Sequence, residues 1–450
     1  MNPEPLEICL DKVAGNEFFD EIRVGRFTRI SFHRTLRIPE DGRDYPLPAG
    51  LGRFPIHRVE DYAEKVPVKW LKEGEFFIPL FVLVLLFLLR PTPSITPILH
   101  AVEDQPIVGA IRWDGWYGEG GVTKELETSL GQKKYHFRLP WFARIINENK
   151  VIINGDSQAI VEQEITYAAQ AGLNYWAFVD YANESPAMHT AMNRYLAAKD
   201  KKGIQYCFVE EGARVDRIGN AGWKRLVEHF RHPDYQTVLD GRPLLFLYVK
   251  TLKLGKADWD ELKRQTLEAC MKAPYLVLMG WDPVQDAKDM TALGFDAISA
   301  YARGGSYSMT QPSYAEQSAL IRRDRWEKSR ALGAPTVTFA SAGWDTRPRN
   351  ERPPSWCKDW VGAASPDLTP PAQQKPLIDS VTATPDELAA HIREALAWTK
   401  ANRDLNPSNA VIIYGWNEND EGGWLQPTLG ADGKPDDARI KALQKVMPPA

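Results

Sequence analysis

The chain has 450 residues, a length that suits one large domain with an extension. Charged residues make up 25% of it, its formal net charge is −4, and no basic stripe runs along it, which together exclude a nucleic-acid-binding protein. The four cysteines form no CxxC pair, and no Cys/His group has the spacing of zinc ligands. Cys207 and Cys270 lie in apolar segments and are expected to be buried.

Residues 1–75 are predicted to form a small α+β segment of unknown role. Short strand-like stretches alternate there with turns and prolines. A segment of this length buries little apolar surface by itself.

The run from Phe76 to Leu89 has 14 residues and no charged side chain. It is shorter than the roughly 20 residues that span a bilayer, but it has the length of the apolar part of a signal peptide. Lysines precede it and a proline-rich linker follows to residue 105, as in an anchor whose N-terminal side stays in the cytoplasm. A short anchor, a signal peptide behind a displaced start and a buried core segment are the alternatives. Export or anchoring is favoured, so the chain is expected outside the cytoplasm, as a secreted, periplasmic or membrane-anchored protein.

From Pro106 onward, apolar strand-like runs alternate with amphipathic helices. Eight strands are predicted, at Ile107–Trp113, Tyr175–Asp180, Gln205–Glu210, Pro243–Val249, Leu276–Trp281, Ala297–Tyr301, Thr336–Ser341 and Ala410–Tyr414. Helices are predicted at Ser157–Ala171, around Trp223–Phe230 and at Pro385–Ala401, where Pro385 suits the first turn.

Eight such units predict a (β/α)8 TIM barrel, an α/β fold, over residues 106–450, behind an N-terminal extension whose fold the pattern does not define. A doubly wound open sheet is the alternative, but no glycine fingerprint follows the first strand.

The last predicted strand ends in a dense cluster of acidic and aromatic side chains. Glu418 and Glu421 are three residues apart, which on a helical turn would place their Cβ atoms roughly 5–6 Å apart. Two carboxyl groups that close do not both ionise freely, so the pair offers one acid and one base near neutral pH. A solvated acidic loop is the alternative, but the apolar strand and the flanking tryptophans favour a catalytic pair.

Acidic and aromatic residues also follow most of the other predicted strands. In a barrel these ends share one face, where carboxylates bind hydroxyl groups and aromatic rings stack on sugar faces. An aspartate after a strand is often a helix cap, which is the alternative for each one alone. The predicted substrate-binding residues, for an oligo- or polysaccharide partner, are Asp114, Trp116, Tyr117, Asp180, Tyr181, Glu210, Glu211, Trp281, Asp282, Tyr301, Trp344, Asp345, Arg347, Trp416 and Asn417.

Other common chemistries find no support in the sequence. No histidine lies at a predicted strand end, so neither a transition-metal centre nor another cofactor is expected. The GxSxG and Walker A motifs of serine hydrolases and phosphoryl-transfer enzymes are missing from the sequence.

Four segments between residues 106 and 427 resemble known sequences, in the right order. WNENDEGGWLQP, at strand eight, resembles the NEWxEGxxxEP-type segment of glycoside hydrolase family 99 and of the WbsX-like proteins encoded in polysaccharide gene clusters. GWDTRPRNERP resembles the GWDNTPR segment of the WbsX-like group, and AGLNYWAFVDY and DGRPLLFLY are similar to two less specific strand segments.

The resemblance implies a TIM barrel that acts on glycans, with α-mannosides as the substrates of family 99. It implies that Glu418 deprotonates the sugar 2-hydroxyl, which attacks the anomeric carbon, and that Glu421 is the general acid and base, with retention of configuration. The chain departs from family 99 at Asp420, where a histidine is usual, and has no clean match to a WHxEPY-like segment; Glu210–Glu211 and Trp281–Asp282 are the candidate substitutes.

The leading hypothesis is therefore a retaining glycoside hydrolase, with endo action on α-mannoside-type glycans as the specific expectation. The first alternative is a glycosyltransferase-type enzyme of surface polysaccharide assembly. The second is a glycan-binding barrel without catalysis, although binding alone does not require two acids three residues apart.

Overall fold

The computed structural model describes four short strands near the N-terminus and residues 105–117, 120–181, 185, 187–248, 253–302, 312–357 and 381–448. The chain divides into two compact units, Met1–Glu103 and Asp104–Ala450. The predicted anchor, Phe76–Leu89, lies outside the described residues. In the part that is described, no helix is both long and apolar enough to cross a membrane.

The first unit contains an antiparallel sheet of four short strands. Its strand order is β1-β2-β3-β4. The strands are β1 (Asp20–Val24), β2 (Thr28–His33), β3 (Thr35–Arg37) and β4 (Asp44–Pro46).

The second unit is built on eight parallel strands, each within two residues of its predicted bounds. They are β5 (Ile107–Arg112), β8 (Tyr175–Val179), β9 (Gln205–Glu211), β11 (Arg242–Tyr248), β12 (Tyr275–Gly280), β13 (Ala297–Ala300), β14 (Thr338–Ser341) and β15 (Ala410–Tyr414). Seven pairs join them in the order β13-β12-β11-β9-β8-β5-β15-β14.

The two ends of this sheet meet and close it. Ile298, in β13, forms a parallel bridge with Thr336, just before β14. The amide of Ile298 donates to Pro335 O at 2.9 Å, and the amide of Val337 donates to Ile298 O at 3.0 Å. The sheet is therefore a (β/α)8 TIM barrel, and the open-sheet alternative is wrong.

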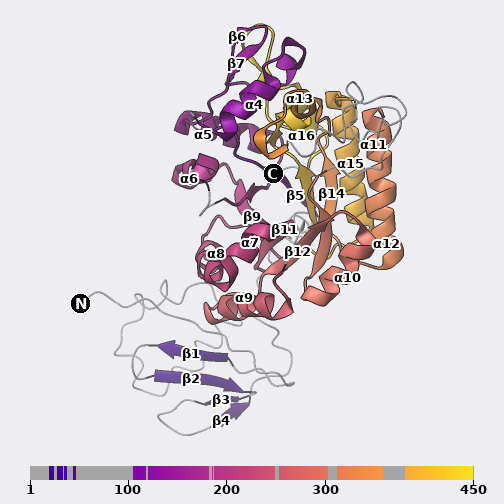
Figure 1. The fold of residues 1–450 in the computed structure, drawn as a ribbon. Coiled ribbons are helices and arrows are strands. Elements are labelled where there is room, and N and C mark those ends of the chain that lie inside the picture. The colour runs from indigo at the N-terminus through magenta and orange to yellow at the C-terminus, as the bar shows by residue number, and fades with distance from the viewer. Residues whose placement is uncertain are drawn as a thin grey trace, which may run out of the picture. The chain divides into compact units, whose positions relative to one another are not determined.

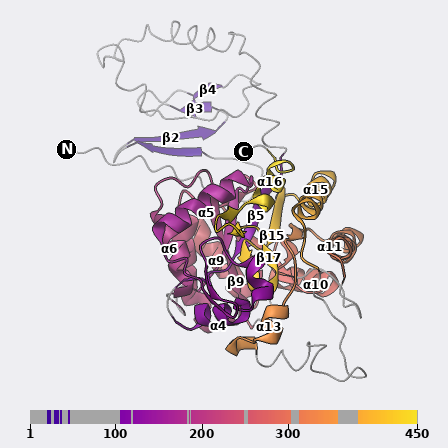
Figure 2. The same cartoon turned by 90° about the horizontal axis from the view of Figure 1, so that it is seen from above.

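Helices surround the barrel on its outer side (Figures 1 and 2). Strands such as β8 and β15 are buried throughout, because helices cover one face and interior side chains fill the other. The helices are α4 (Val122–Leu130), α5 (Gln158–Gln170), α6 (Thr190–Ala197), α7 (Gly212–Ile218), α8 (Trp223–Phe230), α9 (Lys256–Glu268), α10 (Pro283–Leu293), α11 (Tyr314–Ile321), α12 (Lys328–Leu332), α13 (Arg347–Glu351), α15 (Pro385–Ala401) and α16 (Ala438–Gln444).

The three predicted helices are confirmed, and α15 shows why the sequence defines its start. The Thr384 hydroxyl accepts a hydrogen bond from the Glu387 amide, and the Glu387 carboxylate accepts one from the Thr384 amide. Pro385 occupies the first turn, where no amide is needed. The expectation for Cys207 is confirmed, but Cys270 is exposed because it lies in the turn after α9.

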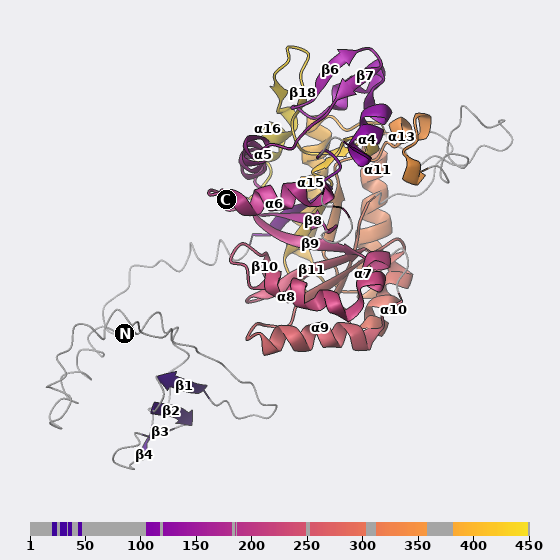
Figure 3. The ribbon, with the colours of Figure 1, turned by 60° about the vertical axis from the view of Figure 1, so that its left-hand side comes forward.

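Short strand pairs lie outside the eight barrel strands. Figures 1 and 3 show the hairpin of β6 (Arg144–Asn147) and β7 (Lys150–Ile152) at the same end as α4 and α13. The other short strands are β10 (Thr237–Val238), which pairs with β11, and the pairs β16 (Asn417–Glu418) with β17 (Gly423–Trp424) and β18 (Thr428–Leu429) with β19 (Pro435–Asp436).

Candidate active site

The acidic cluster lies directly after the last barrel strand, as the sequence predicts. Glu418 ends β16, and Glu421 ends the 3₁₀ turn Asn419–Glu421 that connects β16 to β17. Both side chains are deeply buried, Glu418 with 2% and Glu421 with 6% of its surface exposed. A solvated acidic loop is therefore excluded as the interpretation of this segment.

One guanidinium group holds the cluster together. Arg349, in α13, donates from Nε to Asp420 and from Nη1 to Glu421, and its Nη2 lies 3.5 Å from Glu418 Oε2. Three buried carboxyl groups thus share a single cation. The cation that the structure shows at this cluster is Arg349. In the described ranges, no group of three or more His, Cys, Asp or Glu is arranged to hold a metal ion.

The two glutamates differ in the donors that reach them. Glu421 accepts hydrogen bonds from Arg349 Nη1 and from the Tyr414 hydroxyl, one on each carboxylate oxygen. Glu418 Oε2 accepts no hydrogen bond from any residue that the structure describes. The geometry therefore stabilises a negative charge on Glu421 better than on Glu418.

The electrostatics follow from these contacts. Burial raises the pKa of Glu418 well above its ordinary value, and the charge of Glu421 raises it further, against the opposing effect of Arg349. Burial also raises the pKa of Glu421, but Arg349 and the Tyr414 hydroxyl oppose that increase. The pair is therefore expected to hold one proton near neutral pH, mainly on Glu418.

The backbone fixes the acidic turn against the end of β14. The amide of Asp345 donates to Glu421 O at 2.6 Å. Gly422 follows with φ +83°, and a Cβ there would lie 2.6 Å from the Asp345 amide nitrogen. Only glycine fits this contact, since a side chain would be both strained and obstructed.

Five of the predicted substrate-binding residues lie in a closed network between the ends of β5 and β15. Arg112 donates to Asp114 at 3.1 Å and to Glu164 at 2.7 Å. These five side chains are almost entirely buried, and the contacts that the structure shows for them hold the strand ends together; their contact with a substrate stays a prediction. They are Asp114, Trp116, Tyr117, Trp416 and Asn417.

Asn417 shows how this network positions the acidic hairpin. Its side chain accepts from the Trp113 amide at 2.9 Å and donates to Trp113 O at 2.6 Å, as a neighbouring strand would. Its own carbonyl accepts from Trp116 Nε1 at 2.9 Å. The hairpin that carries Glu418 is thereby attached to the first strand of the barrel.

The acidic residues at the carboxyl ends of β8 and β9 are paired with arginines. Arg225 contacts both Asp180 and Glu210, the latter at 3.2 Å. Arg214 donates to Glu211 at 2.7 Å, and its guanidinium lies 3.8 Å from the centre of the Tyr181 ring. Burial, with the charge of Asp180, raises the pKa of Glu210 well above its ordinary value. The structure brings these four predicted residues, Asp180, Tyr181, Glu210 and Glu211, together at one side of the strand ends.

A series of aromatic rings runs along the carboxyl ends of β11 to β15 and reaches the acidic pair. Tyr248 stacks on Tyr301 with 4.5 Å between ring centres, and Trp281 lies edge-on to Tyr248 at 5.7 Å. Tyr414 lies 6.0 Å from Tyr301 and 5.6 Å from Trp344. Trp281 keeps 38% of its surface exposed, so this aromatic series runs from the protein surface to the tyrosine that contacts Glu421.

The remaining predicted residues, Asp282, Asp345 and Arg347, form hydrogen bonds or ion pairs within the protein. Asp282 accepts from the Val284 amide at 3.1 Å and caps α10, which is the alternative considered for such aspartates. Asp345 is buried between Arg138 and Arg347, which contact its Oδ2 at 2.6 Å each. These arginines hold the pKa of Asp345 below its ordinary value although burial opposes them.

Three residues of the site were not predicted: Tyr248, Arg349 and Tyr414. Tyr248 and Tyr414 are the last residues of barrel strands, so a search that included the last residue of each predicted strand would have found them. Arg349 lies in the long segment after β14, which has no periodicity that would show which arginine returns to the acidic turn. The other part of that segment, residues 358–380, lies outside the described residues.

Comparison with known families gives a match over about half of the chain. Residues 217–434 match the model of a family described as glycosyltransferase WbsX, a range that includes Arg349 and both glutamates. The resemblance to the WbsX-like group is thereby confirmed for these residues. A comparison with curated protein sequences gives no significant match.

Solved structures similar to the chain include the family 99 endo-α-mannosidase from Bacteroides thetaiotaomicron in complex with bis-tris-propane. It is 15% identical with a TM-score of 0.46, over 76% of this chain and 95% of that chain. A β-glucuronidase from Ruminococcus gnavus is 11% identical with a TM-score of 0.37, over 65% of this chain and 47% of that chain.

Proposed function

We propose that the protein is a glycan-active enzyme that cleaves a glycosidic bond with retention of configuration, using Glu418 and Glu421 as its acid and base. The observation that carries this proposal is the pair of buried carboxyl groups that shares one guanidinium, Arg349, at the carboxyl end of the barrel. A shared guanidinium favours the short separation of about 5–5.5 Å between carboxyl groups in retaining enzymes over the longer one in inverting enzymes.

The chemistry requires one protonated and one ionised carboxyl group, and the contacts support that state. The acid protonates the leaving oxygen, while the base takes the proton of the sugar 2-hydroxyl, which attacks the anomeric carbon. Water then opens the resulting anhydro sugar, gives its proton to the former acid, and the former base returns its proton to the 2-oxygen, so configuration is retained. The family resemblance assigns the base to Glu418 and the acid to Glu421. The hydrogen bonds from Arg349 and Tyr414 to Glu421 favour the opposite distribution in this chain, with the proton on Glu418. We therefore propose Glu418 as the acid and Glu421 as the base.

The aromatic series supports a carbohydrate as the substrate. The exposed ring of Trp281 and the half-buried Tyr301 offer apolar faces on which sugar rings stack, and they extend toward Tyr414. An endo action on α-mannosides remains the specific expectation from the family 99 resemblance and from the similar endo-α-mannosidase.

The direct test uses a panel of α- and β-linked oligosaccharides and the detection of new reducing ends. Wild-type protein is expected to release reducing ends from one class of linkage. Glu421→Gln is expected to lose at least about 100-fold in turnover, the lower end for loss of a general acid or base. Glu228→Gln, the same substitution on the exposed face of α8, is the matched control and should be unaffected. Activity of Glu421→Gln within a few-fold of wild type would remove Glu421 from the mechanism.

A glycosyltransferase is the second candidate, because the matching family is described as one. It predicts no release of reducing ends, but transfer from a nucleotide- or lipid-linked sugar to an acceptor glycan. If the protein is a glycan-binding barrel without catalysis, Glu421→Gln and Glu228→Gln should both bind sugar as the wild type does. The same panel, repeated with activated donors, separates these outcomes.

A further inference from the structure

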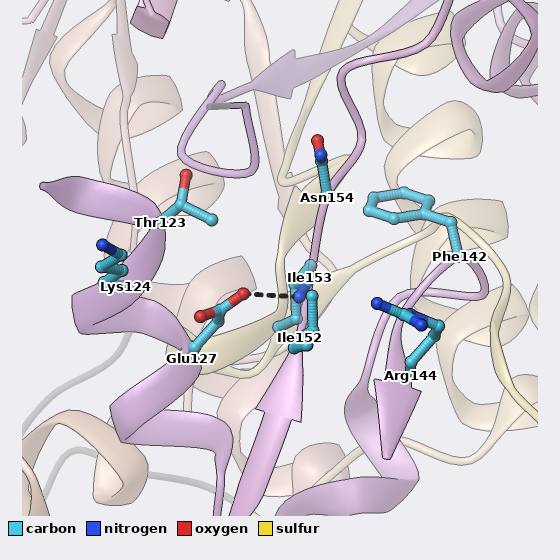
Figure 4. Close-up of a pocket in the computed structure, with 8 residues that line it drawn as sticks. All are labelled: Thr123, Lys124, Glu127, Phe142, Arg144, Ile152, Ile153 and Asn154. Atoms are coloured by element: carbon cyan, nitrogen blue, oxygen red, sulfur yellow. Dashed lines mark hydrogen bonds between the residues drawn. The ribbon is translucent and has the colours of Figure 1, made fainter. Parts of the chain in front are cut away.

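A hollow lies apart from the acidic pair, between helix α4 and the β6–β7 hairpin (Figure 4). It encloses about 580 Å³, within the roughly 300–1,000 Å³ of sites that bind small molecules. Thr123 and Lys124 line it from α4, and Phe142, Arg144 and Asn154 line it from the hairpin and its flanks. The lining therefore combines an aromatic ring, two cations, a hydroxyl group and an amide.

The two cations of this cavity have no acidic partner among the residues that the structure describes. Lys124 and Arg144 are exposed, and neither forms an ion pair there, whereas many other surface lysines and arginines do. The carboxylate of Glu127 also lines the cavity, but it accepts a hydrogen bond from the Ile153 amide at 2.7 Å (Figure 4). With the Glu127 carboxylate counted against Lys124 and Arg144, the lining keeps a net positive charge in a chain whose net charge is −4, and this favours an anion.

The cavity is close to the acidic turn without being part of it. Helix α4 contacts the 3₁₀ turn Asn419–Glu421, α13 and β7. The cavity and the acidic turn therefore adjoin the same helix, which with its side chains is about 10–12 Å across. That is a distance of a few sugar units, which one oligosaccharide can span.

We propose that this cavity binds an acidic sugar unit of a glycan, with Arg144 and Lys124 contacting its carboxylate, sulfate or phosphate group. Phe142 offers a ring face to the sugar, while the exposed side-chain amide of Asn154 offers hydrogen bonds to its hydroxyl groups. The inference rests on the proposed function, because it names acidic glycans as the class that the enzyme takes.

The test measures binding by calorimetry to the full chain carrying Glu421→Gln, so that no probe is consumed. The probes are tetramannuronate, which carries carboxylates, a chondroitin 4-sulfate tetrasaccharide, which also carries sulfates, and neutral mannotetraose. At least one acidic probe is expected to bind about tenfold or more tightly than the neutral one, and to weaken with added salt.

Variants assign that preference to the cavity. Adding Lys124→Gln and Arg144→Gln together should remove the tenfold preference while leaving mannotetraose binding unchanged. Lys150→Gln is the matched control, since it removes an exposed cation from the same hairpin outside the cavity. Equal binding of acidic and neutral probes, no binding of any acidic probe, or an equal loss in Lys150→Gln would overturn the proposal.

A failure of the cavity proposal can be told apart from a failure of the proposed hydrolase function. If charge-dependent binding at Arg144 and Lys124 is found but the wild type releases no reducing ends, the cavity stands and the hydrolase proposal fails. If reducing ends are released but no acidic preference exists, the cavity proposal fails alone.

Discussion

At the scale of single residues, Arg349 determines the electrostatics of the candidate site. It contacts Glu418, Asp420 and Glu421, so one positive charge faces three buried carboxyl groups. Taking such groups out of water costs several kcal/mol per ion, and a protonated glutamate avoids part of that cost. Among the described residues, three buried carboxyl groups face one cation, so a proton is expected on one of them, and the proposed mechanism uses this proton as its acid. Asp420, where family 99 usually has a histidine, is the third carboxyl group of this cluster and accepts a hydrogen bond from Arg349 Nε.

The first prediction concerns the removal of this cation. Arg349→Gln should reduce the free energy of unfolding by about 3–5 kcal/mol at pH 8, the range for breaking a buried pair from one side. Glu418 and Glu421 already have raised pKa values in the folded state, and the loss of Arg349 raises them further. The folded state then binds more protons than the unfolded state above about pH 4.5, so stability falls as pH rises.

Urea unfolding at pH 5 and pH 8 measures this effect. The loss should be larger at pH 8, where the unfolded carboxyl groups are ionised. Arg264→Gln is the matched control, since Arg264 forms its ion pairs on the surface of α9, and its effect on stability should be small and alike at the two pH values. An equal loss for Arg349→Gln at the two pH values would contradict a cluster that holds a proton.

At the scale of elements, the acidic turn is fixed by a close backbone contact with the end of β14. Gly422 and Gly433 both have positive φ, at +83° and +77°, but a Cβ would meet Asp345 at Gly422 and nothing within 4 Å at Gly433. Gly433→Ala should therefore cost about 1 kcal/mol for conformation alone. Gly422→Ala should cost a further 1–3 kcal/mol or so from the obstruction, and should also reduce activity.

Thermal unfolding and turnover of the two variants test this contact. If Gly422→Ala behaves like Gly433→Ala in both measurements, the turn is not held by its packing against Asp345.

The aromatic series gives a second prediction at this scale, because it joins the ends of five strands. Trp281→Ala should raise KM about 3- to 10-fold with little change in kcat, which corresponds to roughly 0.5–1.5 kcal/mol for one aromatic contact. Trp281→Phe should retain most of the affinity, since it keeps a ring face. An unchanged KM for Trp281→Ala would show that this exposed ring does not contact the substrate.

At the scale of the whole molecule, the barrel could be predicted because its strands are buried on both faces. Such strands are continuous apolar runs, so Ala410–Tyr414 was located to the residue. The acidic pair could be located for the same reason, since it follows that strand directly. The pattern does not show which side chains at a strand end face outward, and Trp116 and Trp416 proved to be fully buried.

Loop residues were harder to predict than strand ends. The segment after β14 offers Arg347 and Arg349, and of the two only Arg347 is among the predicted substrate-binding residues. In the structure Arg347 binds Asp345 and is half-exposed, while Arg349 turns inward to the acidic cluster. Both arginines lie in the five-residue helix α13, which is too short for a sequence period to show which of them faces inward.

The predicted anchor is also a property of the whole chain. We propose that Phe76–Leu89 directs the protein to the membrane or across it. The full chain should then be found in the membrane or exported fraction, and Leu83→Arg with Leu85→Arg should return it to the soluble cytoplasmic fraction, since each arginine costs about 2.5–3.5 kcal/mol on insertion. The same distribution for both forms would instead favour a buried core segment.

The measurement that tests the proposed acid and base most directly compares two substrates with the same glycosyl unit. One is an oligosaccharide that the wild type cleaves, and the other is the glycosyl fluoride, whose leaving group needs no protonation. Both Glu418→Gln and Glu421→Gln should lose at least about 100-fold in kcat/KM on the oligosaccharide. On the fluoride, Glu418→Gln should recover most of the wild-type rate, while Glu421→Gln should remain impaired. Recovery by Glu421→Gln alone would reverse the two roles, and near-wild-type cleavage of the oligosaccharide by either variant would contradict a catalytic pair.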